Sequence, residues 1–255
     1  MTQPRTNRAL PGQSTEDVMR LASFIRGSWS IGQDSTEVLS AVTGNVVALA
    51  TGGGFDMREI LAYGRTVGGR NLRRLTFHQR AAMLKKLAEH LSEHKEPLYK
   101  LSFQSGATRT DAMIDVDGGI GTLFAYASKG RRELPNSTFL LDGDIEGLSK
   151  GGTFVGQHVV MPLRGVAVHI NAFNFPCWGL LEKLAPALLA GVPVVTKPAT
   201  VTSYVAHELV RAIIASGILP EGALQLVVGS TGDLFDHLTS LEDYQCRDTA
   251  DPELH

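Results

Sequence analysis

The strongest constraint on the fold is an alternation of apolar runs and helical stretches that begins at residue 165. Short runs rich in valine and isoleucine predict buried strands at 165–170, 192–196 and 224–228. The stretch at 178–190 predicts a helix between the first two strands. Parallel neighbouring strands need a crossover connection, which is usually a helix, so the sequence predicts an α/β fold with a doubly wound, Rossmann-type parallel sheet.

Capping signals predict where two further helices begin and end. Thr76 and Gln79 have capping-box spacing, in which each side chain accepts a hydrogen bond from the other residue's backbone amide. Thr202 or Ser203 is expected to cap the helix after the second strand, and Gly217 is expected to terminate it.

The segments before this alternation complete the predicted organisation. Residues 1–20 are polar and could bury little apolar surface, which predicts a disordered leader. Apolar stretches broken by glycines predict two or three strands near 24–50, and the arms of a β-ribbon are expected near 138–160. One domain is therefore expected at 21–243, followed by a polar tail at 244–255.

Composition excludes several classes of function. The 255 residues carry a formal net charge of −2, so they lack the broad basic field that non-specific nucleic-acid binding requires. No apolar run approaches the roughly 18 residues of a membrane span, and no secretory signal opens the sequence. We expect no nucleic-acid partner, no membrane partner and a cytoplasmic location. Two cysteines, Cys177 and Cys246, offer neither a disulfide framework nor a metal site.

Ligands of parallel sheets bind beyond the carboxyl ends of the strands, and an unusual turn follows each predicted strand. The first strand leads into Asn-Ala-Phe-Asn-Phe-Pro-Cys-Trp at 171–178, and the second into Lys-Pro-Ala-Thr at 197–200. The third leads into Gly-Ser-Thr-Gly at 229–232, which is a weak signal when taken alone. The three turns are expected to meet at one site.

These turns, in this order and at these separations, resemble those of the aldehyde dehydrogenase superfamily. Asn-Phe-Pro at 174–176 together with Lys-Pro-Ala at 197–199 is the specific part of the likeness. Longer runs, such as Leu-Thr-Phe-His-Gln-Arg-Ala-Ala-Met-Leu at 75–84, are very similar to the dehydrogenase domain of bifunctional phenylacetate-degradation proteins. Semialdehyde dehydrogenases of benzoyl-CoA breakdown are similar as well. The likeness implies an aldehyde dehydrogenase cofactor-binding domain at 21–243.

The resemblance implies a reaction in which a cysteine thiolate attacks the aldehyde, hydride passes to a nicotinamide, and water releases the acid. It implies that the Asn174 amide is the catalytic oxyanion donor, a neutral group directed at charge that appears only in the transition state. The alternative interpretation of Asn174 is a turn residue before Phe-Pro. The cofactor-binding residues implied by the resemblance are Ile170, Asn171, Lys197, Thr200, Gly229 and Gly232.

The same resemblance bears on the cofactor and the partners. Lys197 corresponds to the family lysine that contacts the adenosine ribose, and many NAD-preferring relatives carry a glutamate where this chain has Thr200. Such a carboxylate would repel a 2′-phosphate, so the likeness implies NADP, with NAD as the less favoured cofactor. It further implies an aldehyde carried on a CoA thioester as substrate. It also implies a homo-oligomer that assembles through the strands near 24–50 and the ribbon near 138–160.

Several residues imitate catalytic or metal-binding groups. Cys177 lies close to Asn174, but the family thiol belongs to a downstream Gly-Gln-x-Cys segment, so Cys177 is interpreted as a small packed hydrophobe. Glu182 is not expected to replace the family's general base. His90 and His94 stand four residues apart on a helix without an apparent third ligand, which favours a solvated face over a metal site.

No Gly-Gln-x-Cys segment occurs in the 255 residues. The polar tail at 244–255 stands where the family carries a hydrophobic strand, which indicates a frame shift or a premature gene end. One hypothesis is an NADP-dependent semialdehyde dehydrogenase by lineage. Another is an inactive fragment that binds nucleotide or co-assembles with a full-length copy, and a third is a product without a role. The chain by itself is expected to be poorly soluble and unable to oxidise aldehydes.

Overall fold

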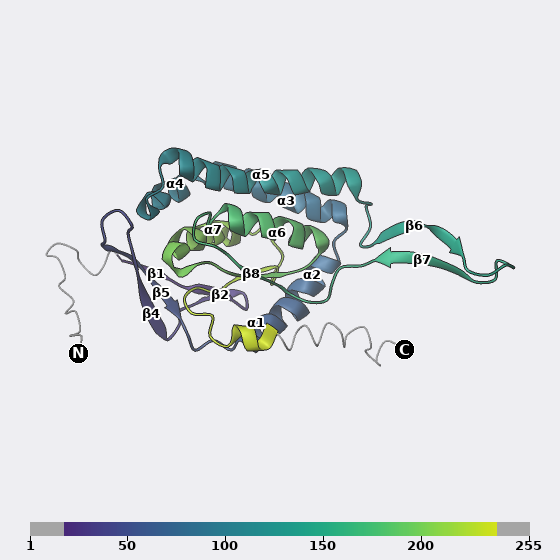
Figure 1. The fold of residues 1–255 in the computed structure, drawn as a ribbon, viewed down its shortest axis with the longest axis horizontal. Helices are drawn as coiled ribbons and strands as arrows, with labels where there is room; N and C mark the ends of the chain where they lie inside the picture. Colours follow the sequence, from purple (N-terminus) through teal and green to yellow (C-terminus); the bar gives the residue numbers. More distant parts are fainter. Residues whose placement is uncertain (1–17, 239–255) are drawn as a thin grey trace.

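The computed structural model describes residues 18–238, which form a layered α/β body and a long two-stranded ribbon (Figure 1). Strand β1 (Met19–Leu21) begins shortly before the domain start expected at residue 21. The predicted polar tail lies outside the described residues, as does most of the predicted leader. Within 18–238 no helix has both the length and the apolar character that a bilayer span demands. The cytoplasmic location stays a prediction.

The central sheet has five strands in the order β3-β2-β10-β9-β8. Three of them, β8 (Ala167–Ile170), β9 (Val194–Lys197) and β10 (Leu224–Leu226), run parallel, which confirms the predicted core of the fold. A hairpin of β2 (Ser23–Ile25) and β3 (Ser28–Ser30) joins β10 in the antiparallel sense. The sheet is therefore mixed, with an antiparallel hairpin added at one edge of its parallel core.

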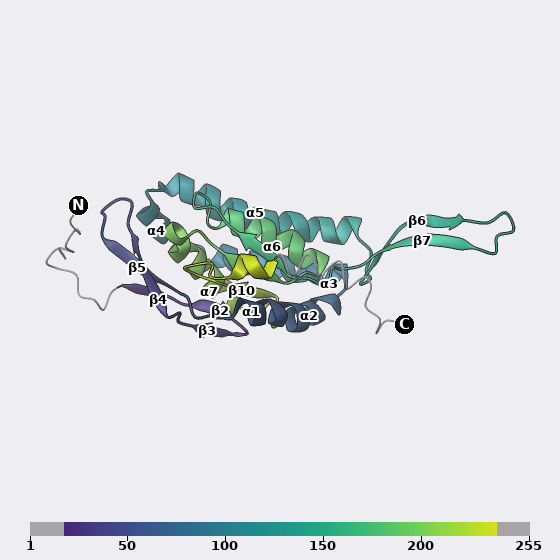
Figure 2. The same cartoon turned by 60° about the horizontal axis from the view of Figure 1, so that its bottom comes forward.

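Helices cover both faces of this sheet, as a doubly wound fold requires (Figures 1 and 2). On one face, α6 (Trp178–Ala190) and α7 (Ser203–Ala215) pack against the strands, with α3 (Phe77–Glu93) and α5 (Arg109–Glu133) outside them. The other face is covered by α1 (Met57–Tyr63), whose apolar residues form a second, smaller core. The connecting elements are η1 (Gly64–Gly68, a π-helical turn), α2 (Gly69–Arg73), α4 (Glu96–Ser102), η2 (Phe103–Ser105) and η3 (Thr200–Thr202).

The strands expected near 24–50 are divided between two sheets. β4 (Asp34–Leu39) and β5 (Val46–Gly52) pair antiparallel, and β1 joins β5 in parallel. These three strands form a separate sheet at the end of the body where α4 lies (Figure 1). The strands near 24–50 therefore do not act as one unit, because β2 and β3 belong to the central sheet.

The predicted ribbon is formed by β6 (Leu140–Gly147) and β7 (Val155–Val160), which pair antiparallel. It projects away from the body in both views (Figures 1 and 2). Apolar side chains remain exposed along it, including Leu141 at 48%, Ile145 at 63% and Val159 at 51%. A two-stranded hairpin is only marginally stable in water, so a ribbon of this kind gains from a covering surface.

Helix α3 begins at the capping box predicted from the sequence. Gln79 N donates to Thr76 Oγ1 at 3.2 Å, and Thr76 N donates to Gln79 Oε1 at 2.8 Å. The two bonds satisfy amides that would otherwise lack an acceptor in the first turn. The predicted helix stop at Gly217 is also confirmed, since its φ of +63° turns the chain just after α7.

Candidate active site

The tips of β8, β9 and β10 lie side by side, so the turns that follow them meet at one edge of the sheet. Asn171 N donates to Lys197 O at 3.0 Å, which joins the turn after β8 to the end of β9. Val227 N donates to Thr196 O at 2.9 Å, which joins the residues after β10 to the same strand. This edge is where α/β sheets bind their ligands.

Asn171 holds a buried amide at the tip of β8. Asn171 is only 4% exposed, and its Nδ2 donates to Thr196 Oγ1 at 2.8 Å. Oδ1 has no hydrogen-bond partner among the described residues, so it is suited to accept a bond from a ligand. Ile170 is 46% exposed. The prediction of a buried strand is wrong for β8, which is half-buried because it lies at the edge of the described sheet.

Lys197 places an ammonium group at the tip of β9. The residue is 9% exposed, and Nζ donates to Pro198 O at 3.2 Å. No acidic side chain within 18–238 forms an ion pair with it, and burial lowers its pKa because desolvation penalises the charged form. Thr200 begins η3 three residues later and is half-buried. A ligand that offers oxygen atoms here would replace the hydration that Lys197 has lost.

The third turn contains two glycines with left-handed backbone, at φ +80° for Gly229 and +52° for Gly232. A Cβ atom on Gly229 would lie 2.9 Å from Gly52 Cα, so this glycine allows two backbone segments to meet. The bare face of Gly232 is open, since a Cβ there would find Met57 Cε as its neighbour at 3.8 Å. Cofactor contact at both glycines stays a prediction, and packing supplies a separate reason for Gly229.

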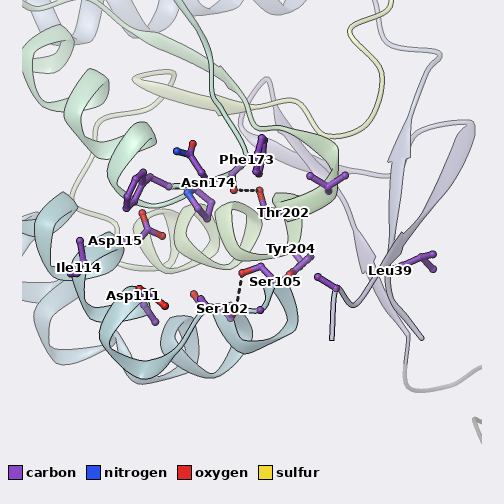
Figure 3. A pocket seen from close by; sticks show the side chains of 17 residues that line it. Leu39, Ser102, Ser105, Asp111, Ile114, Asp115, Phe173, Asn174, Thr202 and Tyr204 are labelled. Atoms are coloured by element: carbon purple, nitrogen blue, oxygen red, sulfur yellow. Dashed lines mark hydrogen bonds between the residues drawn. The ribbon is translucent and has the colours of Figure 1, made fainter. Parts of the chain in front are cut away.

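A pocket of about 640 Å³ opens beside the Asn-Phe-Pro loop. Figure 3 shows Phe173 and Asn174 on one side of it and Asp111 and Asp115 on the other. The Asn174 amide forms no hydrogen bond within the described chain, so it is free to donate to an oxygen atom of a ligand. The charged side chains of described residues that line the pocket are both acidic.

The loop that carries Asn174 is tied to the segment after β9. Thr202 Oγ1 donates to Phe173 O at 3.1 Å. The side-chain cap predicted for α7 is wrong, since no side chain accepts a bond from the first amides of the helix. The two hydroxyls act as donors to carbonyl oxygens, Thr202 Oγ1 to Phe173 O and Ser203 Oγ to Thr200 O at 2.7 Å. Thr202, just before α7, therefore ties the neighbouring loop to this segment.

Asp115 is a residue of this site that the sequence did not reveal. Its carboxylate, on α5, accepts hydrogen bonds from Trp178 N at 2.7 Å and from Cys177 N at 3.2 Å. The available signal was an acid in the apolar stripe of α5, one turn after Ala112 and one turn before Gly119. A charged residue on a buried helix face requires partners, which is a reason to expect a specific contact there.

The residues that resemble catalytic or metal-binding groups in the sequence have structural roles. Cys177 is fully buried, and burial, followed by the nearby Asp115 carboxylate, raises its pKa well above the usual value. A buried thiol of this kind is a poor nucleophile, which confirms the packing interpretation. Glu182 forms an ion pair with its neighbour on the surface of α6. The rings of His90 and His94 stack at 4.2 Å, and the part of the chain that the structure describes contains no cluster of three metal-ligating side chains.

The fold and the site define the class of protein. The profile of the aldehyde dehydrogenase family matches residues 29–246, and the chain belongs to this family. It is 45% identical over 226 residues to 3,4-dehydroadipyl-CoA semialdehyde dehydrogenase of Aromatoleum evansii. The match covers 88% of this chain and 44% of that protein, so the chain spans less than half of the relative's length.

Solved aldehyde dehydrogenases share the fold. The NADP-dependent glyceraldehyde-3-phosphate dehydrogenase of Bacillus halodurans, complexed with NADP, gives a TM-score of 0.72 at 24% identity and covers 86% of this chain and 46% of its own. A betaine aldehyde dehydrogenase of Staphylococcus aureus, in complex with NAD+, gives 0.69 at 19% identity and covers 85% and 42%. These likenesses establish the fold, and the two cofactors named in them leave the choice between NADP and NAD to the site.

Proposed function

We propose that this chain is the dinucleotide-binding part of an NADP-dependent aldehyde dehydrogenase, which oxidises a CoA-linked semialdehyde to its acid in aromatic-acid (phenylacetate) catabolism. The observation that carries the proposal is the convergence of the Asn174 and Lys197 turns in a chain 45% identical to a CoA-semialdehyde dehydrogenase. Because the chain spans 44% of that relative, the activity of the whole protein is itself part of the proposal.

In this proposal Asn174 is the oxyanion donor. Its amide is neutral and unpartnered, and the residue lines a pocket of substrate size, so it can stabilise the negative charge that forms when a nucleophile adds to a carbonyl carbon. We assign the nucleophile and the general base to no residue here, because Cys177 is buried and the 255 residues contain no Gly-Gln-x-Cys segment. The alternative of a nucleotide-binding fragment without catalysis uses the same cofactor site.

The residues at the strand tips fit NADP better than NAD. Lys197 has no acidic partner in the described chain, and Thr200 brings a hydroxyl where a carboxylate would repel a 2′-phosphate. Asn171 Oδ1 is a buried acceptor that a ribose hydroxyl can satisfy. When bound, the nicotinamide of such a cofactor accepts a hydride. The protein's part is to hold the dinucleotide at these tips, with Ile170, Gly229 and Gly232 as further proposed contacts.

The pocket supports a substrate that carries no charge close to its aldehyde. A semialdehyde that ends in a second carboxylate requires a cation in its binding pocket, whereas the charged residues that line this one, Asp111 and Asp115, are acids. A thioester carbonyl has no charge and tolerates these walls. The absence of a cation from the described lining therefore favours a CoA-linked aldehyde over a free dicarboxylic semialdehyde.

The cofactor assignment is tested by Thr200→Glu. The unchanged chain is expected to bind NADPH more tightly than NADH. The new carboxylate should weaken NADPH binding about tenfold, since two like charges near a protein surface repel by a few kcal/mol at most, and should leave NADH binding unchanged or improved. Fluorescence titration of the purified 255-residue chain with each nucleotide measures both affinities.

A matched control is Thr110→Glu, an exposed threonine in the first turn of α5 that lies far along the chain from the strand tips. It should leave both affinities unchanged. Tighter binding of NADH than of NADPH by the unchanged chain would contradict the NADP assignment. Binding of neither nucleotide would contradict the proposed cofactor site.

We further propose that the protein self-associates through its ribbon, because Leu141 and Val159 are direct cross-strand partners and both are about half exposed. Replacing them together, Leu141→Lys with Val159→Glu, keeps an attractive cross-strand pair while removing the apolar surface. We expect sedimentation velocity to show a smaller species than the unchanged chain. Asp142→Asn, in the adjacent pair with His158, is the control and should leave the sedimentation coefficient unchanged.

A further inference from the structure

The amino end of α6 has no cap of its own. Cys177 occupies the N-cap position, and no side chain of the helix accepts a hydrogen bond from its first amides. The acceptor comes from another helix: Asp115 Oδ1 receives Trp178 N at 2.7 Å, and both carboxylate oxygens receive Cys177 N at 3.2 Å. One side chain of α5 thus supplies the function that a Ser, Thr or Asp at the N-cap usually fulfils.

The Asp115 carboxylate depends on these amides in return. Asp115 is 5% exposed, and within residues 18–238 no cation forms an ion pair with it. Burial raises its pKa, and the bonds from Trp178 and Cys177 oppose that shift by stabilising the charged form. The positive end of the α6 dipole adds to this stabilisation. Asp115 and the start of α6 therefore hold each other in place.

Asn174 lies between this contact and a second one. Two residues separate it from Cys177, and one of them, Pro176, is buried and fixed in φ. On the other side, the neighbouring Phe173 carbonyl accepts the Thr202 hydroxyl at 3.1 Å. The Asn174 amide has no hydrogen bond in the described chain, so its direction is set by the backbone that these two contacts hold.

We propose that Asp115 is the positioning residue for the Asn174 amide, acting by clamping the loop between β8 and α6 to α5. The role of Asn174 as oxyanion donor rests on the proposed function. The attachment of the loop to α5 by Asp115 does not depend on it. Figure 3 shows both side chains at the pocket, Asn174 from the loop and Asp115 from α5. A loop fixed in this way would present the amide to a substrate oxygen without reorganisation.

The test compares Asp115→Asn with Asp117→Asn in the full 255-residue chain. Asp117 is a matched control on the same helix, because its carboxylate accepts bonds from Lys95 Nζ and Tyr99 OH, both at 2.8 Å, and, among the described residues, none from the Asn174 loop. Hydrogen exchange of the Cys177 and Trp178 amides, measured by NMR, should be at least about tenfold faster in Asp115→Asn, because a charge-assisted bond is replaced by a weaker neutral one. Asp117→Asn should leave those amides unchanged.

A second signal separates positioning from simple capping. The side-chain NH₂ of Asn174 should give one sharp pair of resonances in the unchanged chain and broadened or doubled resonances in Asp115→Asn. Faster exchange at Cys177 and Trp178 with an unaltered Asn174 signal would overturn the proposal, since Asp115 would then only cap the helix. Unaltered exchange would overturn it as well.

A variant-free measurement covers the case in which Asp115→Asn does not fold. Acidification of the unchanged chain should protonate Asp115 and release the Trp178 amide before amides in the interior of α6 lose protection; simultaneous loss would overturn the clamp. NADPH titration of the unchanged chain tests the proposed function separately from the contact between Asp115 and the loop. Failure to bind NADPH would refute the cofactor site and leave the exchange result standing.

Discussion

Replacing Gly68 with alanine is expected to lower the free energy of unfolding by about 3 kcal/mol or more. Gly68 ends η1 and faces the turn that leads into β10. A Cβ atom there would lie 2.0 Å from Gly222 O, 2.5 Å from Gly222 C and 2.9 Å from Pro193 Cβ. Two of these atoms are backbone, and Gly222 itself has a left-handed φ of +77°. Relief therefore requires the whole turn before β10 to move.

Gly121 provides the matched control for this substitution. It lies inside α5, and a Cβ atom there would meet nothing within 4 Å. Alanine at this position is expected to raise the free energy of unfolding by roughly 0.5–1 kcal/mol, because it restricts the unfolded chain and suits a helix. Urea denaturation followed by circular dichroism measures both variants. Similar effects of the two substitutions would contradict the close packing between η1 and the turn before β10.

The part of the fold that was predictable is the part in which local signals and burial agree. Helix α6 spans Trp178–Ala190, the range predicted, because its leucines form a buried stripe and Gly191, at φ +84°, ends it. β9 and β10 are continuous buried runs bounded by prolines and glycines. In such segments the residues that favour the element are also those that pack, so the sequence alone is sufficient.

The remainder depends on partners that are distant in sequence. The pairing of β2 with β10 is supported by Ser23 Oγ, which accepts a bond from Val228 N across 205 positions, and no local pattern contains that information. The segment Met57–Arg73 was not predicted as helical, because Gly64, Gly68 and Gly69 weaken helical propensity. The structure explains why residue 68 is a glycine, since only a glycine can approach Gly222 so closely.

The candidate site shows the same division. The residues after each strand could be named from the sequence, and the register of Ile170 against Lys197 brings the first two turns together. The contact between Asp115 and Trp178 joins residues 63 positions apart and depends on how α5 crosses α6. Gly229 was predicted to contact the cofactor, whereas in the structure the side that lacks a Cβ packs against the backbone of Gly52. A motif indicates where a site lies, and packing determines what each residue in it does.

Acidification from pH 7.5 to 5.5 is expected to cost about 1 kcal/mol of stability through His169, after allowance for solvent screening, and to lower stability further through His207. Burial, followed by the nearby Lys183, lowers the pKa of His169 to about 4. Burial also lowers the pKa of His207, with opposing smaller effects from Glu208 and Arg211. Each folded pKa lies below the unfolded value of 6.5, so the unfolded chain binds the proton first. The stability is intact above pH 6.5 and is lost as the pH falls toward the folded pKa.

The surroundings of the His169 and His207 rings explain why protonating either ring in the folded protein costs free energy. Neither nitrogen of His207 nor Nδ1 of His169 has a hydrogen-bond partner among the residues described, and the His207 ring packs 5.1 Å from the ring of Trp29. Urea denaturation at both pH values should therefore show a pH dependence that His169→Gln and His207→Gln each reduce. His158→Gln, on the exposed ribbon, should leave it unchanged. If all four proteins lose the same stability on acidification, other groups cause the acid sensitivity and the two buried rings do not.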